Sequence, residues 1–421
     1  MIRIVMIAMP AAGHVNPSAP LVRELIRRGI DVTFYATEEF RAVAEQAGAT
    51  FRAYPDGTIS SKVIADANAH GGSAKVVQRL LEATQTLLPL LESELREDPP
   101  DAIMFDSNAL WGRMLATSLR RPAISLMTTI LVNASAFRSL TVRECLAVVW
   151  ETATSLPGTL GARRRLLRSP GRDLLPSSPM FPARGDLTIF PIPAWIQPPD
   201  DRCDASSHFV GPSIDAAPHS EEIDRQLERL LEDGTPLVLV SLGTLHRGGE
   251  DFFRSCIDAF AALPANVLLV VGRAMGPADF ESVSSNIVVR AVVPQLTVLR
   301  QAAVFVTHGG MNSVMEGLHF EVPMVVIPQQ VEQFLIGQAV ADRGAGLVLR
   351  QHLSGQKVST RELRTTVETL LDDSSYTASA RTLAATLHEG GGAMEAADLI
   401  ERLLAGSPPH ENETTESRQP A

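Results

Sequence analysis

Short apolar runs recur along the chain, and polar stretches with helical periodicity separate them. The first run, residues 2–9, is uninterrupted and leads to Gly13, which is typical of a strand buried on both faces. Asn16 and Pro17 suit the cap and first turn of a helix, and Gly29 suits its end before a second strand. The start of the chain therefore predicts a β-α-β unit.

The same alternation continues through two halves of the chain. In the first half we expect strands at 31–36, 101–105 and 122–126, and helices at 38–47, 73–97 and 108–119. In the second half we expect strands at 237–241, 266–271, 286–289, 303–307 and 323–327, and helices at 220–232, 361–372 and 376–405. Strands alternating with helices form parallel sheets, so we predict an α/β fold of two Rossmann-like, doubly wound domains.

The regular pattern fails between about 155 and 220, where Pro, Gly, Ser and Arg dominate. We expect loops there, with an interdomain linker from about 195. The predicted units are an N-terminal domain over 1–210, a C-terminal domain over 211–375, helices over 376–405 that pack back towards the N-terminal domain, and a disordered tail over 406–421.

Composition narrows the classes of function. With 421 residues the chain is long enough for two cores, and its net charge of -11 disfavours a nucleic-acid polymer as partner. The three cysteines are too far apart to suggest disulfides or a metal site, so we expect a cytoplasmic protein. No stretch approaches the roughly 20 apolar residues of a membrane-spanning helix, and the first apolar run is short for a signal peptide.

The segment from Val304 to Phe334 carries the most distinctive chemistry. Its glycines permit close approach of a ligand to the backbone, and the following helix N-terminus favours an anion such as a diphosphate. The candidate donors and acceptors there are His308, Gly309, Gly310, Asn312, Ser313 and Glu316. The alternative is an ordinary strand-to-helix turn followed by a capped helix.

Three further turns follow predicted strands of the second half, at the sheet edge where ligands bind. Glu332 and Gln333 offer acceptors for sugar hydroxyls, although acidic residues are also common in the first turn of a helix. The other candidates are Ser241, Gly243 and Thr244 for phosphate, and Val293 and Gln295 for the edge of a base. For Val293 and Gln295, a plain turn would look the same.

In the first half, His14 follows the first strand and Asp106 ends the strand predicted at 101–105, so both fall on one sheet edge. An imidazole suits proton removal near neutrality, and a carboxylate could hold one ring nitrogen protonated. Alternatively, His14 is a solvated turn residue and Asp106 a helix cap.

Five motifs together resemble the macrolide-type bacterial branch of the UDP-glycosyltransferase family, and the resemblance covers residues 1–405. The motifs are GHVNP at 13–17, SLGT at 241–244, VPQ at 293–295, HGGMNSVMEG at 308–317 and PQQVEQF at 328–334. The resemblance implies the GT-B fold and an inverting enzyme that needs no metal or other cofactor. It also implies a UDP-glucose or TDP-deoxysugar donor and a natural-product acceptor, in antibiotic biosynthesis or resistance.

The resemblance assigns roles to the candidate residues. His14 looks like the general base and Asp106 like its partner. The donor would be held by Gln295 at the pyrimidine, by His308, Gly310, Asn312 and Ser313 at the diphosphate, by Glu316 at the ribose, and by Glu332 and Gln333 at the sugar. Many relatives carry Asp in place of Glu332 and Trp in place of Val293, so sugar and base preferences are open.

The acceptor should lie against the first domain, along the less regular stretches 55–75 and 130–185, with Phe51, Phe137 and Trp150 expected nearby. An apolar polycyclic or macrocyclic alcohol or phenol is the natural substrate, such as a macrolide, polyketide or polyphenol. The basic stretch 162–172 predicts a solvated helix face, with a membrane-surface or acidic-partner contact as the alternative.

Two other classes of function remain open from sequence. One is a non-catalytic nucleotide-sugar-binding auxiliary protein, and the other a nucleotide-sugar 2-epimerase or hydrolase on the same scaffold. The chain could act as a monomer or a homodimer.

Overall fold

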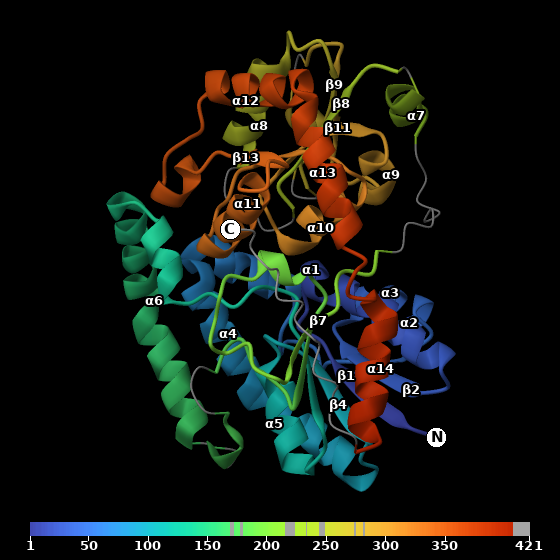
Figure 1. Ribbon diagram of the computed structural model, residues 1–421. Helices are drawn as coiled ribbons and strands as arrows, with labels where there is room; N and C mark the ends of the chain where they lie inside the picture. The colour runs from blue at the N-terminus through green and yellow to red at the C-terminus, as the bar shows by residue number, and fades with distance from the viewer. Residues whose placement is uncertain are drawn as a thin grey trace, which may run out of the picture.

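The computed structural model consists of two parallel α/β domains, one above the other in Figure 1. It describes residues 1–168, 172–176, 180–214, 224–232, 234–243, 249–272, 275–280 and 283–406. The first sheet has seven strands in the order β3-β2-β1-β4-β5-β6-β7, and the second has six in the order β10-β9-β8-β11-β12-β13. Every strand pair is parallel, which confirms the predicted fold class.

Apolar composition explains where the strands lie. β1 is buried at residues 4–7 because it pairs with β2 on one side and β4 on the other, while helices cover both sheet faces. The strands of the first sheet are β1 (Arg3–Ile7), β2 (Asp31–Ala36), β3 (Thr50–Ala53), β4 (Ala102–Asp106), β5 (Ala123–Leu126), β6 (Leu187–Phe190) and β7 (Ser207–Phe209). Those of the second are β8 (Leu237–Ser241), β9 (Asn266–Val270), β10 (Ile287–Arg290), β11 (Ala302–Thr307), β12 (Met324–Val326) and β13 (Gly346–Val348).

Helices connect these strands. In the first domain they are α1 (Ala12–Val15), α2 (Ala19–Arg27), α3 (Arg41–Gln46), α4 (Ser61–Glu97), α5 (Leu110–Leu119) and α6 (Val142–Arg168). From Arg225 onwards they are α7 (Arg225–Glu232), α8 (Gly249–Phe260), α9 (Gln295–Leu299), α10 (Met311–His319), α11 (Val331–Ala341), α12 (Thr360–Asp372), α13 (Ser374–Thr386) and α14 (Gly392–Leu404).

The expectation of irregular structure over 155–220 is wrong in two respects. α6 continues to Arg168 with Pro157 inside it, and the region also contributes β6 and β7 to the first sheet. These strands are only four and three residues long, so they carry too little pattern to separate them from loops. The short strands β3 and β13 were missed for the same reason.

Helix starts differ from the prediction at two places. Asn16 does not cap a helix, because α1 already begins at Ala12 and Asn16 has helical backbone angles. The helix predicted from 73 begins at Ser61, and Gly71 and Gly72 interrupt its geometry just before the predicted start.

The last two helices belong to different domains. α13 packs against α10, whereas α14 crosses to α2 of the first domain (Figure 1). Ala396, Leu399 and Ile400 of α14 are buried in the same core as β1 and β2. Residues 407–421, where a disordered tail is expected, lie outside the described part of the chain.

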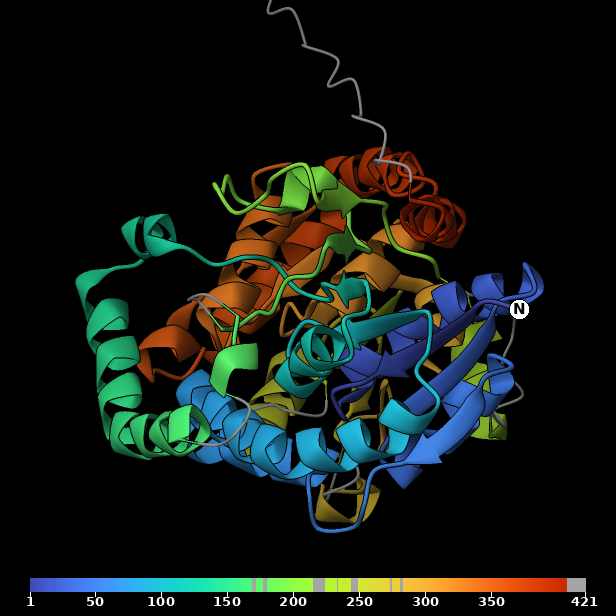
Figure 2. The same cartoon turned by 90° about the horizontal axis from the view of Figure 1, so that it is seen from below.

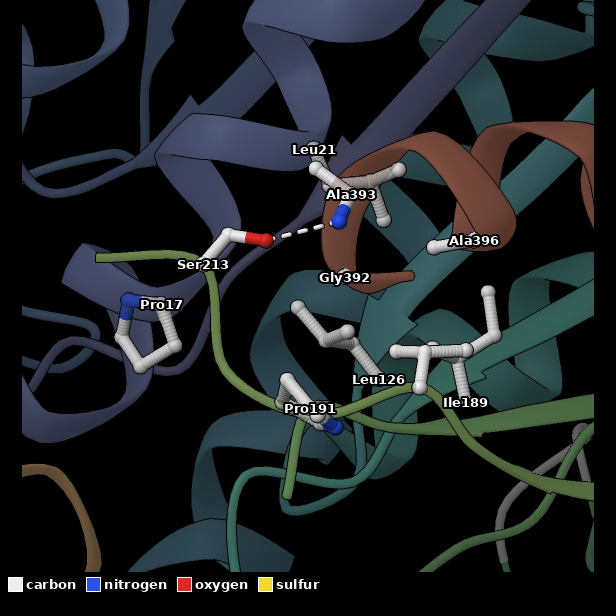
Figure 3. A pocket seen from close by; sticks show the side chains of 11 residues that line it. Pro17, Leu21, Leu126, Ile189, Pro191, Ser213, Gly392, Ala393 and Ala396 are labelled. Carbon is white, nitrogen blue, oxygen red and sulfur yellow. Dashed lines mark hydrogen bonds between the residues drawn. The ribbon is translucent and has the colours of Figure 1, made fainter. Parts of the chain in front are cut away.

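The two segments that join the domains bind each other. The Gly392 N–H donates to the Val210 carbonyl at 2.7 Å, and the Ala393 N–H donates to Ser213 Oγ at 2.6 Å. Figure 3 shows this second bond beside a small apolar pocket, with Leu21 and Ile189 on its wall. Where the chain passes between the domains, the segments 210–213 and 392–393 are therefore hydrogen-bonded to each other.

Candidate active site

His14 and Asp106 form a hydrogen-bonded pair at the carboxyl edge of the first sheet. His14 Nδ1 lies 2.8 Å from Asp106 Oδ2, and the His14 side chain is 19% exposed while that of Asp106 is fully buried. A carboxylate only accepts, so Nδ1 carries the hydrogen in this pair. The other ring nitrogen, Nε2, is then the basic one.

The helix-cap interpretation of Asp106 is wrong, because α5 begins at Leu110, its N-cap residue is Ala109, and no side chain caps it. The two oxygens of Asp106 instead have one side-chain and one backbone partner. Oδ2 accepts from His14, and Oδ1 accepts from the Asn108 N–H at 2.8 Å. The backbone bond fixes the carboxylate at the turn after β4, and this fixes the plane of the imidazole in turn.

Sequence reasoning missed Thr128, which also contacts the pair. Its hydroxyl lies 2.9 Å from His14 Nδ1 and donates to Asp106 Oδ2 at 3.1 Å. Thr128 follows β5, the strand that pairs with β4 with Leu126 opposite Asp106. Its place just after the strand predicted at 122–126 puts it at the same sheet edge, but other polar residues at strand ends share this feature.

Charge on both sides of His14 affects its protonation. Burial of the ring opposes the charged form, but the Asp106 carboxylate and the more distant Glu332 outweigh it and raise the pKa of His14 above 6.5. Burial also raises the pKa of the Glu332 carboxyl, against the effects of Thr129 and His14.

Glu332 comes from the second domain, in the first turn of α11, and faces His14 across the domain boundary. Its carboxylate accepts from the Thr129 hydroxyl of the first domain. The neighbouring Gln333 has a structural task, because its Oε1 accepts from the Gln329 N–H at 2.9 Å. Glu332 lies in the first turn of α11, as the helix-start interpretation expects, and it also reaches into the other domain.

The turn after β11 is compact because its glycines leave room for His308. A Cβ on Gly243 would lie 2.7 Å from His308 Cε1, and one on Gly310 would overlap Nε2. Gly309 has a φ of +83°, and a Cβ there would lie 2.6 Å from a methyl group of Val326. His308 therefore sits between the loop after β8 and the turn that opens α10.

The N-terminus of α10 meets the His14 loop directly. Gly310 provides no side-chain cap, and the Asn312 amide donates to the Gly13 carbonyl at 3.1 Å. Ser313 is partly buried in the same first turn. The N–H groups of this turn consequently open towards the first domain.

One turn further along α10, Glu316 accepts from the Gln295 amide at 2.6 Å. Burial raises the pKa of Glu316 to about 7, although the bond from Gln295 acts in the opposite direction. Val293 packs against the core of the second domain beside them. The two residues expected at the base and at the ribose are thus adjacent.

Ser241 ends β8 opposite Thr307 of β11 and is buried. Thr244 lies outside the described residues. Ser241 and Gly243 are therefore adjacent to the His308 turn, and the rest of the SLGT motif stays a prediction.

Further contacts connect the domains outside this group. The Gln330 amide donates to Asn68 Oδ1, and Arg350 Nε donates to Glu144 Oε1 at 2.7 Å. Together with the bonds of Glu332 and Asn312, they bring the edges of the two sheets into contact.

The expected acceptor stretches are largely helical rather than irregular, because α4 covers 61–75 and α6 covers 142–168. Phe51 is wrong as a lining residue. It is buried in the core on β3, with the Arg41 guanidinium 4.5 Å above its ring. Phe137 and Trp150 are exposed. The basic stretch is an exposed helix face over 163–165, which fits both interpretations given for it, and 169–171 lie outside the described residues.

Within the described ranges, no three His, Cys, Asp or Glu side chains come together as a metal site would require. None of the described helices combines the length and apolar character needed to cross a bilayer.

Comparison with known proteins identifies relatives over nearly the whole chain. Residues 254–402 match the family model described as Erythromycin biosynthesis protein CIII-like, C-terminal domain. An NDP-glycosyltransferase of Bacillus subtilis is 32% identical over 405 residues, covering 96% of this chain and 98% of the relative. The oleandomycin glycosyltransferase of Streptomyces antibioticus is 32% identical over 412 residues, covering 95% and 90%.

Solved structures agree with these relatives. The glycosyltransferase of kitacinnamycin matches with a TM-score of 0.77 at 30% identity, covering 95% of this chain and 98% of that one. The calicheamicin glycosyltransferase CalG4 matches with a TM-score of 0.74 at 26% identity, covering 97% and 100%. The chain therefore belongs to the macrolide-type branch of the UDP-glycosyltransferase family and is a GT-B glycosyltransferase that takes its sugar from a nucleotide-sugar donor.

Proposed function

We propose that this enzyme inverts the anomeric centre of its donor sugar without a metal and transfers the sugar to a hydroxyl of an apolar natural product. The observation that carries the proposal is the bond from Asn312 to the Gly13 carbonyl, next to the His14–Asp106 pair. It brings a candidate base of the first domain beside the N-terminus of α10 in the second.

In the proposed reaction, His14 Nε2 removes the proton of the acceptor hydroxyl while that oxygen bonds to the anomeric carbon. The bond from this carbon to the β-phosphate oxygen breaks on the opposite face, and the electron pair leaves with the nucleoside diphosphate. One displacement inverts the carbon. The positive end of α10 and His308 stabilise the departing negative charge, the task that a metal ion performs in other enzymes.

The donor is proposed to lie along α10 and α11. Glu316 would exchange its bond with Gln295 for the ribose hydroxyls and leave the amide for the pyrimidine. Glu332 would exchange Thr129 for hydroxyls of the sugar. Each carboxylate would give up one bond from a neutral partner, worth about 1.5–3 kcal/mol net, and regain bonds of the same kind from the donor hydroxyls.

For the acceptor we propose an apolar macrocyclic or polycyclic alcohol or phenol. The names of the relatives support this class, since they include an oleandomycin glycosyltransferase and a demethyllactenocin mycarosyltransferase of Streptomyces fradiae. The latter is 31% identical, covering 96% of this chain and 87% of the relative.

The proposal is tested by combining UDP-glucose, other UDP-sugars and TDP-deoxysugars with macrolide, polyketide and phenolic acceptors, and reading products by mass spectrometry. We expect glycosides whose anomeric configuration, read by NMR, is opposite to that of the donor, and equal rates with and without EDTA. Release of free nucleotide or an epimerised donor without any acceptor would instead favour the hydrolase or epimerase alternative. Retained configuration would contradict inversion.

The activity should fall on the acid side, with a midpoint at higher pH than the pKa of an ordinary histidine. The base must be neutral, and Asp106 and Glu332 raise the pKa of His14, so it becomes protonated at a higher pH than an ordinary histidine. Glu332→Gln removes one of the two charges and should move the midpoint of kcat/KM to lower pH, with Glu389→Gln as an exposed control. An identical midpoint in wild type and Glu332→Gln would contradict this coupling.

Gly310→Ala should weaken binding of UDP or TDP about ten-fold or more, measured by calorimetry. The backbone angles of Gly310 (φ -62°, ψ 139°) suit alanine, so the effect comes only from the methyl group, which would displace the His308 ring. Gly276→Ala is the matched control, because a Cβ there meets nothing within 4 Å. Equal nucleotide affinity of the Gly310→Ala variant and the wild type would show that His308 does not contribute to the proposed diphosphate site.

A further inference from the structure

α6 carries a row of large apolar side chains that its own domain leaves uncovered. The row, here called the α6 stripe, consists of Val142, Leu146, Val149, Trp150, Leu156 and Leu160. Its first four members are between 61% and 77% exposed. Successive members are four, three, one, six and four residues apart, which at 3.6 residues per turn places all of them within about 120° of the helix circumference.

The α6 stripe points away from the protein. The residues that α6 buries are Glu144, Ser155, Ala162 and Leu166, which share the opposite face of the helix. This buried face packs on α4, where the Ser155 hydroxyl donates to the Gly71 carbonyl and Thr159 donates to that of Ala74. In Figure 1 and Figure 2 the helix lies on the outer flank of the molecule. The stripe therefore faces solvent rather than the domain boundary.

Arginines stand at both ends of the stripe. Arg138 and Arg143 flank its start, and Arg163, Arg164 and Arg168 its end. All five are exposed, and none forms an ion pair within the described part of the chain. The two acidic residues of α6 do not offset them, because Glu144 is buried against Arg350 and Glu151 is turned partly inward. This flank is thus basic, although the whole chain has a net charge of -11.

We propose that the α6 stripe and its arginines dock the enzyme on the surface of an anionic membrane, with α6 parallel to the bilayer. A helix of this kind buries its apolar face at the level of the headgroups while basic residues contact lipid phosphates. A tryptophan at the edge of the stripe suits that depth. This inference does not depend on the identity of the sugar or acceptor.

A second copy of the chain fits the stripe less well. If two copies paired through α6 with the helices parallel, Arg163 and Arg164 would lie against the same arginines of the second copy. If the helices were antiparallel, they would lie against Arg143 of the second copy. The exposed face of α6 has no acidic residue to meet them. An anionic bilayer supplies both the apolar layer and the missing negative charge.

The test uses the full chain and vesicles of phosphatidylcholine, with or without 30 mol% phosphatidylglycerol, in a flotation assay. We expect the protein to float with anionic vesicles at low salt, less so at 0.5 M NaCl, and not with neutral vesicles. Leu146→Gln/Trp150→Gln should weaken binding by at least about 100-fold, because two large apolar groups no longer enter the interface. Leu90→Gln, an exposed apolar residue of α4 outside the stripe, is the matched control.

The charge contribution is tested separately. Arg163→Gln/Arg164→Gln/Arg168→Gln should weaken binding about 100-fold, since each arginine near an anionic surface contributes roughly five-fold. The control replaces three exposed arginines elsewhere, Arg225, Arg229 and Arg361, and should bind as wild type does. Thermal unfolding and transfer to a water-soluble acceptor establish that each variant is folded.

Three outcomes would overturn the proposal. They are no flotation of the wild type, equal flotation of stripe and control variants, and a wild-type dimer in light scattering that becomes a monomer in the Leu146→Gln/Trp150→Gln variant. The last would assign the stripe to a second copy. If a variant loses transfer activity but floats as the wild type does, the result concerns the proposed function and not the α6 stripe.

Discussion

His14→Ala is expected to lose about two to four orders of magnitude in transfer to alcohols while still binding the nucleotide. The imidazole has the buried Asp106 carboxylate behind it, which leaves the other ring nitrogen free to accept a proton. An alcohol has a very high pKa, so without a base it remains protonated and is a poor nucleophile. Phenols, which ionise more readily, should lose less.

The measurement is kcat/KM with an alcohol and a phenol acceptor, together with the Kd for UDP or TDP. His70→Ala serves as the control, because this histidine is exposed on α4 and its Nδ1 lies against the carbonyl of Asp66. Undiminished transfer by His14→Ala would refute the assigned role. A loss of the same size in nucleotide affinity would show damage to the fold instead.

Asp106→Asn should reduce kcat by roughly two to four orders of magnitude, even though the side chain keeps its shape. The amide oxygen can still accept from the Asn108 N–H, so the amide nitrogen must face His14 Nδ1. Nδ1 then becomes an acceptor, and the hydrogen moves to Nε2, the nitrogen that has to take the proton. The imidazole is still present, but its Nε2 carries a hydrogen and cannot accept the proton of the acceptor hydroxyl.

Asp101→Asn is the matched control, since Asp101 lies at the other end of the same strand and accepts from the Arg3 N–H near the surface. It should leave kcat within about two-fold of wild type. The Asp106→Asn variant should also titrate His14 at lower pH by NMR, because a negative charge has gone. Normal activity together with the lowered pKa would show that the tautomer does not matter.

The sequence predicted the fold well wherever the elements were long and buried. The continuous apolar strands β1, β4, β8 and β11 were found with errors of one or two residues, because burial on both faces leaves a clear signal. The short strands β6 and β7 were not found, since their pairing depends on neighbours far along the chain.

The residues of the site were also predictable only in part. His14 and Asp106 could be placed on one edge from the order of strands, and their 2.8 Å contact agrees with that reasoning. Thr128 was not recognised, because nothing in its local sequence distinguishes it from other strand ends. The bond from Thr129 to Glu332 could not be foreseen either, since it depends on how the two domains meet.

The position of α14 has a consequence for synthesis of the protein. Residues 3–209 of the first sheet leave the ribosome long before 392–404, yet α14 closes one side of their core. Until it arrives, apolar surface around Leu21 and Val210 stays open to water. The first domain is thus completed last, after the whole second domain has emerged, and chains that terminate before 392 leave its core unfinished.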